Sequence, residues 1–378
     1  MRPKFEEGGK LHAFHSLFDA MDTFFYTPEQ TTVSGCHIRD AVDNKRTMFT
    51  VIIALIPALL FGMYNIGYQH YLSLGQVSCY CDNFWGNLGY GFLKILPMLL
   101  VSYIVGLGIE CIFAQIRKHE VSEGYFVTGM LIPLICPPDV PLWQLAIAVA
   151  FAVIIGKEVF GGTGYNFLNP ALVARAFLFF SYPSQMSGDT VWIAEQGDAI
   201  SGATPLGEML AGGVAPQASV LDMFLGFIPG SVGETSVIAI LIGAVILLVT
   251  GIASWRIMLS IFAGGAAMGL VFNMIGANPY MEMPFYYHFL IGGFMFGAVF
   301  MATDPVTAAQ TNIGKYIYGA LIGIMAILIR VLNPAYPEGM MLSILLLNVF
   351  APLIDYYVVD ANIRRRAKRA KLLVKNNQ

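Results

Sequence analysis

Residues 47–67 read TMFTVIIALIPALLFGMYNIG and contain no charged side chain. Lipid offers the backbone no hydrogen-bonding partners, so a segment that crosses a bilayer is usually a helix of about 20 mostly apolar residues. Nine more segments fit this description, although the third and fifth of the ten are short and interrupted by Pro or Gly: 88–113, 124–136, 141–157, 167–183, 235–252, 256–275, 286–303, 314–332 and 339–359. The sequence predicts an all-α polytopic membrane protein with about ten transmembrane helices.

The composition of the whole chain supports this class. Of 378 residues, 57% are hydrophobic and 12% are charged, whereas a soluble domain carries about 25% charged residues. Such a composition excludes a soluble enzyme and a disordered chain, and no basic surface is present for binding nucleic acid. The five cysteines have no metal-binding spacing.

The basic residues predict the orientation. All but three of the 21 lysines and arginines lie before the first span, at the ends of even-numbered spans, before spans seven and nine, or in the tail. The loops 68–87, 184–234 and 276–285 contain no lysine or arginine. Positively charged loops stay in the cytoplasm, so both termini are expected there. The expected segments are a cytoplasmic arm, a first membrane repeat, an external loop, a second membrane repeat and a basic cytoplasmic tail: 1–46, 47–183, 184–234, 235–359 and 360–378.

The chain also contains an internal repeat. The sequence LNPA at 168–171 recurs at 332–335, and at the same offset Pro141 corresponds to Pro305. The first LNPA lies at the inner end of its span and the second at the outer end, as two inverted five-helix halves require. Broken helices leave free backbone groups, which membrane proteins tolerate only beside protein, a cavity or a ligand. A binding site is therefore expected near the pseudo-symmetric centre.

Carboxylates at membrane depth are the first candidate site residues. They cost about 3 kcal/mol at a helix centre and usually face a polar interior, and their oxygens suit small alkali and alkaline-earth cations. A structural alternative is pairing with Arg175 or Arg330, or capping of a half-helix. The three candidates for a cation path are Glu110, Asp304 and Asp355.

The external loop contains a motif that composition alone would assign to a turn. Residues 198–204, DAISGAT, resemble the flavinylation motif on which a flavin transferase links FMN through a phosphoester to a threonine hydroxyl. The resemblance implies covalent FMN on Thr204. Asp198 would orient a metal or the hydroxyl during transfer, and Ser201 is the nearby alternative hydroxyl.

Further motifs extend the resemblance over nearly the whole chain, in order: FEEGGK (5–10), FYTP (25–28), HIRD (37–40), RKHEVSEGYFVTG (117–129), KEVFGGTGYNFLNPALVARAFLFFSYP (157–183), IPGSVGETS (228–236), GIASWRI (251–257), FMATDPVT (300–307) and RVLNPAYPEGMM (330–341). Together they resemble the B subunits of the bacterial Na⁺-translocating NADH:quinone oxidoreductases. The resemblance implies one subunit of a six-subunit inner-membrane translocase, with a urea-transporter-like arrangement of ten spans. It also implies covalent FMN, riboflavin, and ubiquinone as substrate, and it assigns the three carboxylates to a sodium path.

Two further groups of residues are candidates for these ligands. The Gly-rich stretch 161–169 has neither a dinucleotide fingerprint nor a Walker lysine, and the amides of Asn166 and Asn169 are expected to pair with riboflavin; the alternative is helix capping. Gly106 would admit a flat ring or another helix. Tyr125 and Phe126 would stack on the quinone or, alternatively, anchor the membrane interface.

The expected function is passage of electrons from NADH, oxidised elsewhere in the complex, through FMN and riboflavin to quinone, coupled to sodium export. Two alternatives remain open. An Rnf-type subunit is similar in sequence and would not reduce quinone, although the arm at 1–46 argues against it. A urea-channel-like permease would carry no flavin on Thr204.

Overall fold

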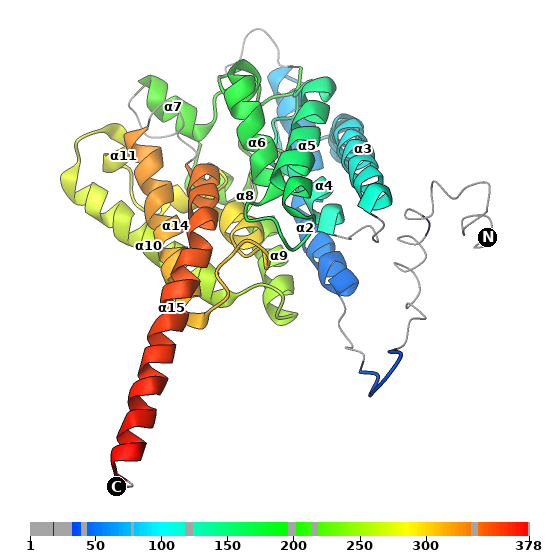
Figure 1. Cartoon of the computed structure of the whole chain (residues 1–378). Coiled ribbons are helices and arrows are strands. Elements are labelled where there is room, and N and C mark those ends of the chain that lie inside the picture. The colour runs from blue at the N-terminus through cyan, green and yellow to red at the C-terminus, as the bar shows by residue number, and fades with distance from the viewer. Residues whose placement is uncertain are drawn as a thin grey trace, which may run out of the picture.

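The computed structural model describes residues 18, 32–38, 44–76, 79–117, 124–195, 202–212, 218–333 and 339–376. Within these ranges every regular element is a helix, and the helices form one bundle (Figure 1). Six helical segments are long and apolar enough to cross a membrane. They are α2 (Asn44–Ser73), α3 (Phe84–Arg117), α5 (Leu142–Gly156) with the following turn η3 (Glu158–Phe160), α10 (Trp255–Ile275), α14 (Asn312–Leu332) and α15 (Met340–Asn376).

Three shorter apolar helices complete the first half and begin the second: α4 (Gly124–Ile135), α6 (Pro170–Ser181) and α9 (Val237–Val249). The expected span at 286–303 is broken into α12 (Tyr287–Leu290), α13 (Phe294–Phe296) and the π-helix η5 (Gly297–Met301). Gly292 and Gly293, with φ of +69° and +66°, form the break. Positive φ is readily adopted by glycine alone, which explains the two glycines at this point.

Short elements occupy the connecting segments: η4 (Pro183–Gln185), α7 (Pro205–Gly212), α8 (Val220–Leu225) and α11 (Pro279–Glu282). The basic tail expected at 360–378 is not a separate element, because α15 continues from the bundle through this region as one helix (Figure 1). The polytopic membrane class predicted from the sequence is confirmed.

The two halves run in opposite directions. The first helices of the halves, α2 and α9, pack together: Gly243 of α9 lies against the Ala54 carbonyl, and Asn65, further along α2, donates to the carbonyl of Ile228, which precedes α9 (3.0 Å). Residue numbers therefore rise along one helix as they fall along the other, so the pair is antiparallel.

Corresponding helices also pack as a pair within each half. α3 packs against α5 in the first half, and α10 packs against α14 in the second. Arg256 and Asn312 join the starts of α10 and α14 (2.8 Å), and Asn278 donates to the carbonyl of Val331 near their ends (3.3 Å), so this pair is parallel. The fold is an inverted repeat, as the LNPA positions predict.

Buried helix ends find partners inside the protein. The carbonyls of Leu134 and Cys136, at the end of α4, accept from the backbone N–H groups of Gly233 (2.7 Å) and Val232 (3.3 Å). In the second half the side chain of Arg330, which is fully buried, donates to the carbonyls at the end of α12, those of His288 (2.7 Å), Ile291 (3.2 Å) and Gly292 (3.2 Å). Unpaired carbonyls in an apolar interior would cost several kcal/mol, so these contacts make the broken helices stable.

Candidate functional site

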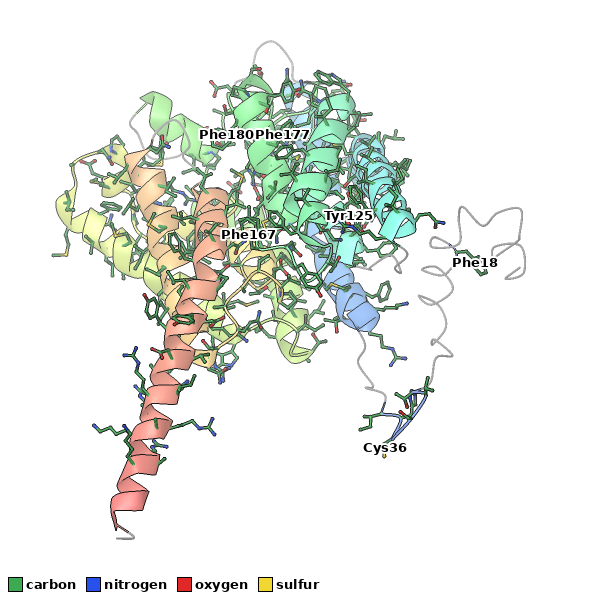
Figure 2. The ribbon with its side chains drawn as sticks, in the orientation of Figure 1. Phe18, Cys36, Tyr125, Phe167, Phe177 and Phe180 are labelled. Atoms are coloured by element: carbon green, nitrogen blue, oxygen red, sulfur yellow. The ribbon has the colours of Figure 1, made fainter. Side chains whose placement is uncertain are left out.

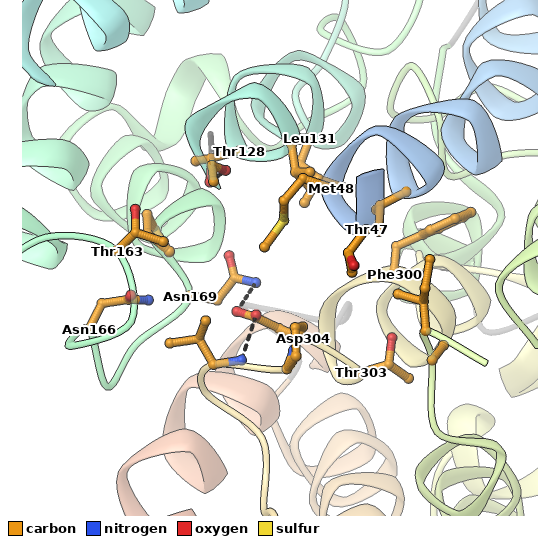
Figure 3. Close-up of a pocket in the computed structure, with 18 of the residues that line it drawn as sticks. Thr47, Met48, Thr128, Leu131, Thr163, Asn166, Asn169, Phe300, Thr303 and Asp304 are labelled. Carbon is orange, nitrogen blue, oxygen red and sulfur yellow. Dashed lines mark hydrogen bonds between the residues drawn. The ribbon is translucent and has the colours of Figure 1, made fainter. Parts of the chain in front are cut away.

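A mainly apolar cavity with several polar side chains in its wall lies between the two halves (Figure 3). The start of α2, the face of α4, the turn after α5 and the segment after η5 enclose it. Its polar lining comes from Thr47, Thr128, Lys157, Thr163, Asn166, Asn169, Thr303 and Asp304. The cavity is therefore lined by residues of both halves.

Asn169 and Asp304 face each other across this cavity (Figure 3). Asn169 is the N-cap of α6: its Oδ1 accepts from the Ala171 N–H (3.0 Å), while its Nδ2 donates to Asp304 Oδ2 (3.4 Å). Asp304 also accepts from the Val306 N–H (3.1 Å) and the Thr307 hydroxyl (3.0 Å). The capping alternative is therefore confirmed for Asn169, whereas Asp304 holds a turn and caps no helix.

Asn166 lies on the same wall of the cavity. Its Oδ1 accepts from the Gly164 N–H (3.3 Å), and its Nδ2 donates to the Leu168 carbonyl (3.0 Å). These bonds hold the Gly-rich turn in shape. An amide nitrogen has two N–H donors and an amide oxygen two lone pairs, so the side chain retains hydrogen-bonding capacity toward the cavity.

Glu110 of α3 forms a buried ion pair with Lys157, the residue directly after α5. The side chains are 3% and 4% exposed. The partner of Glu110 is therefore Lys157 and neither Arg175 nor Arg330, the two arginines considered from the sequence. A second pair, Arg117 with Glu158 (3.4 Å), lies further along the two helices and is more exposed on the arginine side. α3 and α5 therefore end together at a cluster of four charges.

The residues predicted to bind quinone pack largely against each other. Tyr125 lies within the bundle (Figure 2), is fully buried and donates to the Ser102 carbonyl (2.8 Å). Its ring occupies the space where a side chain on Gly106 would lie. The flat ring beside Gly106 therefore belongs to the protein itself. Phe126, the next residue, is only half-buried.

Asp355 of α15 contacts the start of α14. Its carboxylate accepts from the backbone N–H groups of Gln310 (2.6 Å) and Thr311 (3.0 Å) and from the Thr311 hydroxyl (2.5 Å). A carboxylate at a helix N-terminus is stabilised by the exposed N–H groups and by the helix dipole. Among the described residues no three His, Cys, Asp or Glu side chains form a metal-binding group, so the three predicted carboxylates do not form one cation cage.

Thr204 precedes α7 and accepts at its Oγ1 from the Gly207 N–H (3.2 Å); its carbonyl accepts from the Glu208 N–H (2.9 Å). It is therefore an N-cap with a half-buried side chain. Leu206, two residues after Thr204, is anchored in the bundle, because its carbonyl accepts from the Tyr280 hydroxyl (2.7 Å). Asp198 and Ser201 lie outside the described residues.

Three buried charged side chains were not singled out from the sequence as site residues, and of these only Lys157 lines the cavity: Lys157, Glu234 and Arg330. Glu234 pairs with Arg175 (2.7 Å) and accepts from Ser231. Arg175 and Arg330 could be recognised as cations inside spans, but their partners are on other elements. Lys157 resembles an ordinary basic residue at a span end, and only packing shows that it is buried.

These features define a polytopic membrane protein with two inverted halves and a cavity between them. The chain belongs to the NQR2, RnfD, RnfE family, whose model matches residues 31–364. It is 51% identical over 390 residues to the B subunit of the Na(+)-translocating NADH-quinone reductase of Ectopseudomonas mendocina, an alignment that covers 97% of this chain and 96% of the relative. The protein of the same name from Klebsiella pneumoniae is 49% identical, with 98% of each chain covered. The resemblance stated from the motifs is confirmed.

Proposed function

We propose that this chain is the B subunit of a Na⁺-pumping NADH:quinone reductase in a bacterial inner membrane, with both termini in the cytoplasm. It passes electrons from FMN on Thr204 to riboflavin in the central cavity and on to ubiquinone, coupled to sodium export. The names of its full-length relatives support the activity. NADH is oxidised by another subunit, since this sequence has no dinucleotide fingerprint.

The single observation that carries the proposal is the position of Thr204 at the N-terminus of the eight-residue helix α7. The hydroxyl accepts a hydrogen bond from Gly207, and an ester oxygen keeps a lone pair for the same bond, so attachment leaves the cap intact. A phosphate there would face the positive end of the helix dipole. A flavin transferase would form the bond, and the attached FMN would supply one-electron transfer.

The central cavity suits a neutral flavin. Asn166 and Asn169 present amides, and Thr163 and Thr303 present hydroxyls, from both halves of the chain. Such groups can pair with the donor and acceptor edge of a ring without needing a phosphate. The contact with Asp304 would set the position of the Asn169 amide, and the Gly-rich turn would set the position of the Asn166 amide.

Quinone is proposed to bind at the end of the bundle where Phe126 is half-buried. Tyr125 and Gly106 pack against each other beside Phe126 and would fix the backbone of Phe126.

The sodium path is proposed to use Glu110, Asp304 and Asp355, whose oxygens are hard ligands. Other subunits of the complex would supply the remaining ligands and the electron input.

The decisive experiment is Thr204→Val in the assembled complex, with flavin fluorescence of the denatured chain and peptide mass mapping. Loss of the covalent flavin with the complex still assembled is the expected result. Ser219→Ala is the matched control, because Ser219 caps α8 in the same external segment through the Asp222 N–H (3.1 Å). It should lose a cap and keep the flavin. Retention of the flavin by Thr204→Val would overturn the assignment.

Two other functions are separated by simple measurements. An Rnf-type subunit would carry the flavin in a complex without quinone reductase activity. A permease would give a colourless protein with no mass added at Thr204. The names of the relatives, all quinone reductase subunits, favour the first proposal.

A further inference from the structure

The helix α7, which follows Thr204, is docked against the rest of the protein by one face. Leu206 and Met209 are three residues apart and so lie on the same side of the helix, where they are 2% and 3% exposed. The side chain of Thr204 is half-buried. Only one residue separates Thr204 from Leu206, so a contact that fixes Leu206 also fixes Thr204.

The backbone of α7 is anchored by a tyrosine of the second half. The Leu206 carbonyl accepts from the hydroxyl of Tyr280 (2.7 Å), whose side chain is buried. Tyr280 belongs to α11, which packs beside α7 (Figure 1). A carbonyl oxygen has two lone pairs, so it can serve its own helix and the tyrosine at once. Tyr280 therefore holds α7 without interrupting it.

The Leu206 side chain is a second anchor, at the glycine break of the second half. A Cβ atom on Gly292 would lie 2.4 Å from Leu206 Cδ1 and 2.8 Å from Arg330 Nη2. Gly292 has a φ of +69°, and its carbonyl accepts from Arg330 (3.2 Å). The glycine thus leaves the space that Leu206 fills, and α7 rests on the broken helix.

Tyr280 is itself held by two long helices. Asn273 Nδ2 of α10 donates to the Met281 carbonyl of α11 (2.7 Å). Asn278 Nδ2, at the start of α11, donates to the Val331 carbonyl near the end of α14 (3.3 Å). α10 and α14 pack together as the parallel pair of the second half. The Tyr280 hydroxyl is therefore a donor in a fixed place, and α7 takes its position from it.

We propose that Tyr280 is the positioning residue for the flavin on Thr204, because it holds the flavin-bearing helix in a fixed place on the second half. The inference rests on the proposed function, in which Thr204 carries FMN. Tyr280 acts through Leu206 and takes no part in the chemistry. The rate of a reaction between held groups depends steeply on their placement, and a misplacement of about 1 Å can cost about a hundredfold.

The test is Tyr280→Phe in the assembled complex, which keeps the ring and removes the hydroxyl. Flavin fluorescence of the denatured chain should show full covalent attachment, because Thr204 is unchanged. Hydrogen exchange of the peptide 205–212 should be faster, since α7 opens more easily without its anchor. Stopped-flow transfer of electrons from NADH to quinone, normalised to covalent flavin, should slow about tenfold or more. NADH oxidation by an artificial acceptor at the input subunit should not change.

Two further variants complete the test. Leu206→Ala removes the side-chain anchor while Tyr280 keeps its acceptor, and it should slow the same transfer. Tyr80→Phe is the matched control, because it removes a tyrosine hydroxyl that donates to Asp222 of α8 (2.6 Å) and leaves α7 untouched. Its electron transfer and its exchange of 205–212 should match the wild type.

Wild-type electron transfer in Tyr280→Phe with the flavin attached would overturn the inference, even if the exchange of α7 is faster, because the anchor would then be structural only. The same slowing in Tyr80→Phe would overturn it as well. A wild-type complex without a flavin on Thr204 would instead overturn the proposed function, whatever the exchange of α7.

Discussion

Asn169 Nδ2 donates to Asp304 Oδ2 across 3.4 Å and thereby joins two turns that are 135 residues apart in the chain. Asn169 belongs to the LNPA sequence of the first half and Asp304 to the ATDP sequence of the second. Each of them also holds its own turn, through the N–H groups of Ala171 and Val306. One hydrogen bond thus fixes the two halves against each other at the cavity.

Replacing Asp304 with Ala should destabilise the complex by about 1–3 kcal/mol, because buried donors on Asn169, Val306 and Thr307 lose their acceptor. Asp304→Asn should cost less, since its carbonyl oxygen can still accept from Val306. Thermal unfolding of the purified complex measures both variants. Equal losses would show that the charge, and not the hydrogen bonds, is what stabilises this turn.

Arg330→Met should destabilise the second half by about 3 kcal/mol or more, because three buried carbonyls at the end of α12 lose a charged donor. Arg256→Met is the control: Arg256 bonds to Asn312 at a solvent-exposed helix start, where the expected loss is about 1 kcal/mol or less. Unfolding midpoints measured side by side give the comparison. A small effect of Arg330→Met would mean that other groups can pair with these carbonyls.

Gly106→Ala should cost about 1–3 kcal/mol through overpacking, because the added methyl group meets the Tyr125 ring. Gly108→Ala, two residues away on α3, places its methyl group in open space and should be neutral or slightly stabilising, as alanine favours helix. Differential stability of the two complexes is the readout. If quinone binds beside Phe126, only Gly106→Ala should also raise the quinone concentration at half-maximal rate.

The segment that ends at Glu195 should detach from the bundle as pH falls. Glu195 accepts from Lys94 (2.8 Å) and the Tyr90 hydroxyl (3.0 Å), and its N–H donates to Asp139 (2.9 Å). The hydrogen bonds from Lys94 and Tyr90 hold the pKa of the Glu195 carboxyl below its ordinary value of 4.5. A lowered native pKa contributes stability that is fully present above the ordinary value and is lost as pH falls through the native value.

Proteolytic cleavage near residue 195, followed from about pH 7 to about pH 3.5, tests this sign. We expect cleavage in the wild type to increase only at the acid end. Glu195→Gln should be cleaved faster at neutral pH and change little with pH, because it lacks the titrating group. A wild-type rate of cleavage that is constant over this range would contradict the prediction.

Asp355→Asn separates two roles of one carboxylate. The amide oxygen can still accept from Gln310 or Thr311, so assembly should persist, whereas Asp355→Ala should lose about 0.5–1.5 kcal/mol as the backbone N–H groups just before α14 lose their acceptor. If Asp355 is a sodium ligand, a loss of about 1.4 kcal/mol of binding free energy raises half-saturating sodium tenfold. Turnover against sodium concentration, normalised to assembled flavin, gives this value. Wild-type sodium dependence in Asp355→Asn would leave capping as its role.

The sequence by itself predicts the membrane class, the approximate helix bounds and the inverted repeat, because each depends on local patterns. Long apolar segments have one stable form in lipid, and loop charge sets their direction. The break of the span expected at 286–303, at Gly292 and Gly293, is seen only in the structure. Thr204 is recognised from a resemblance, and its position before a helix agrees with the Pro that follows it.

The tertiary structure alone decided which charges meet. Glu110 pairs with Lys157, Arg175 with Glu234, and Arg330 with the carbonyls of the broken α12. Spacing along the chain carries no information on these pairs, since each joins different elements whose approach depends on how whole helices pack. A charge in an apolar interior is stable only beside its partner. The fold therefore determines where the cavity lies and which cation, that of Lys157, pairs with Glu110.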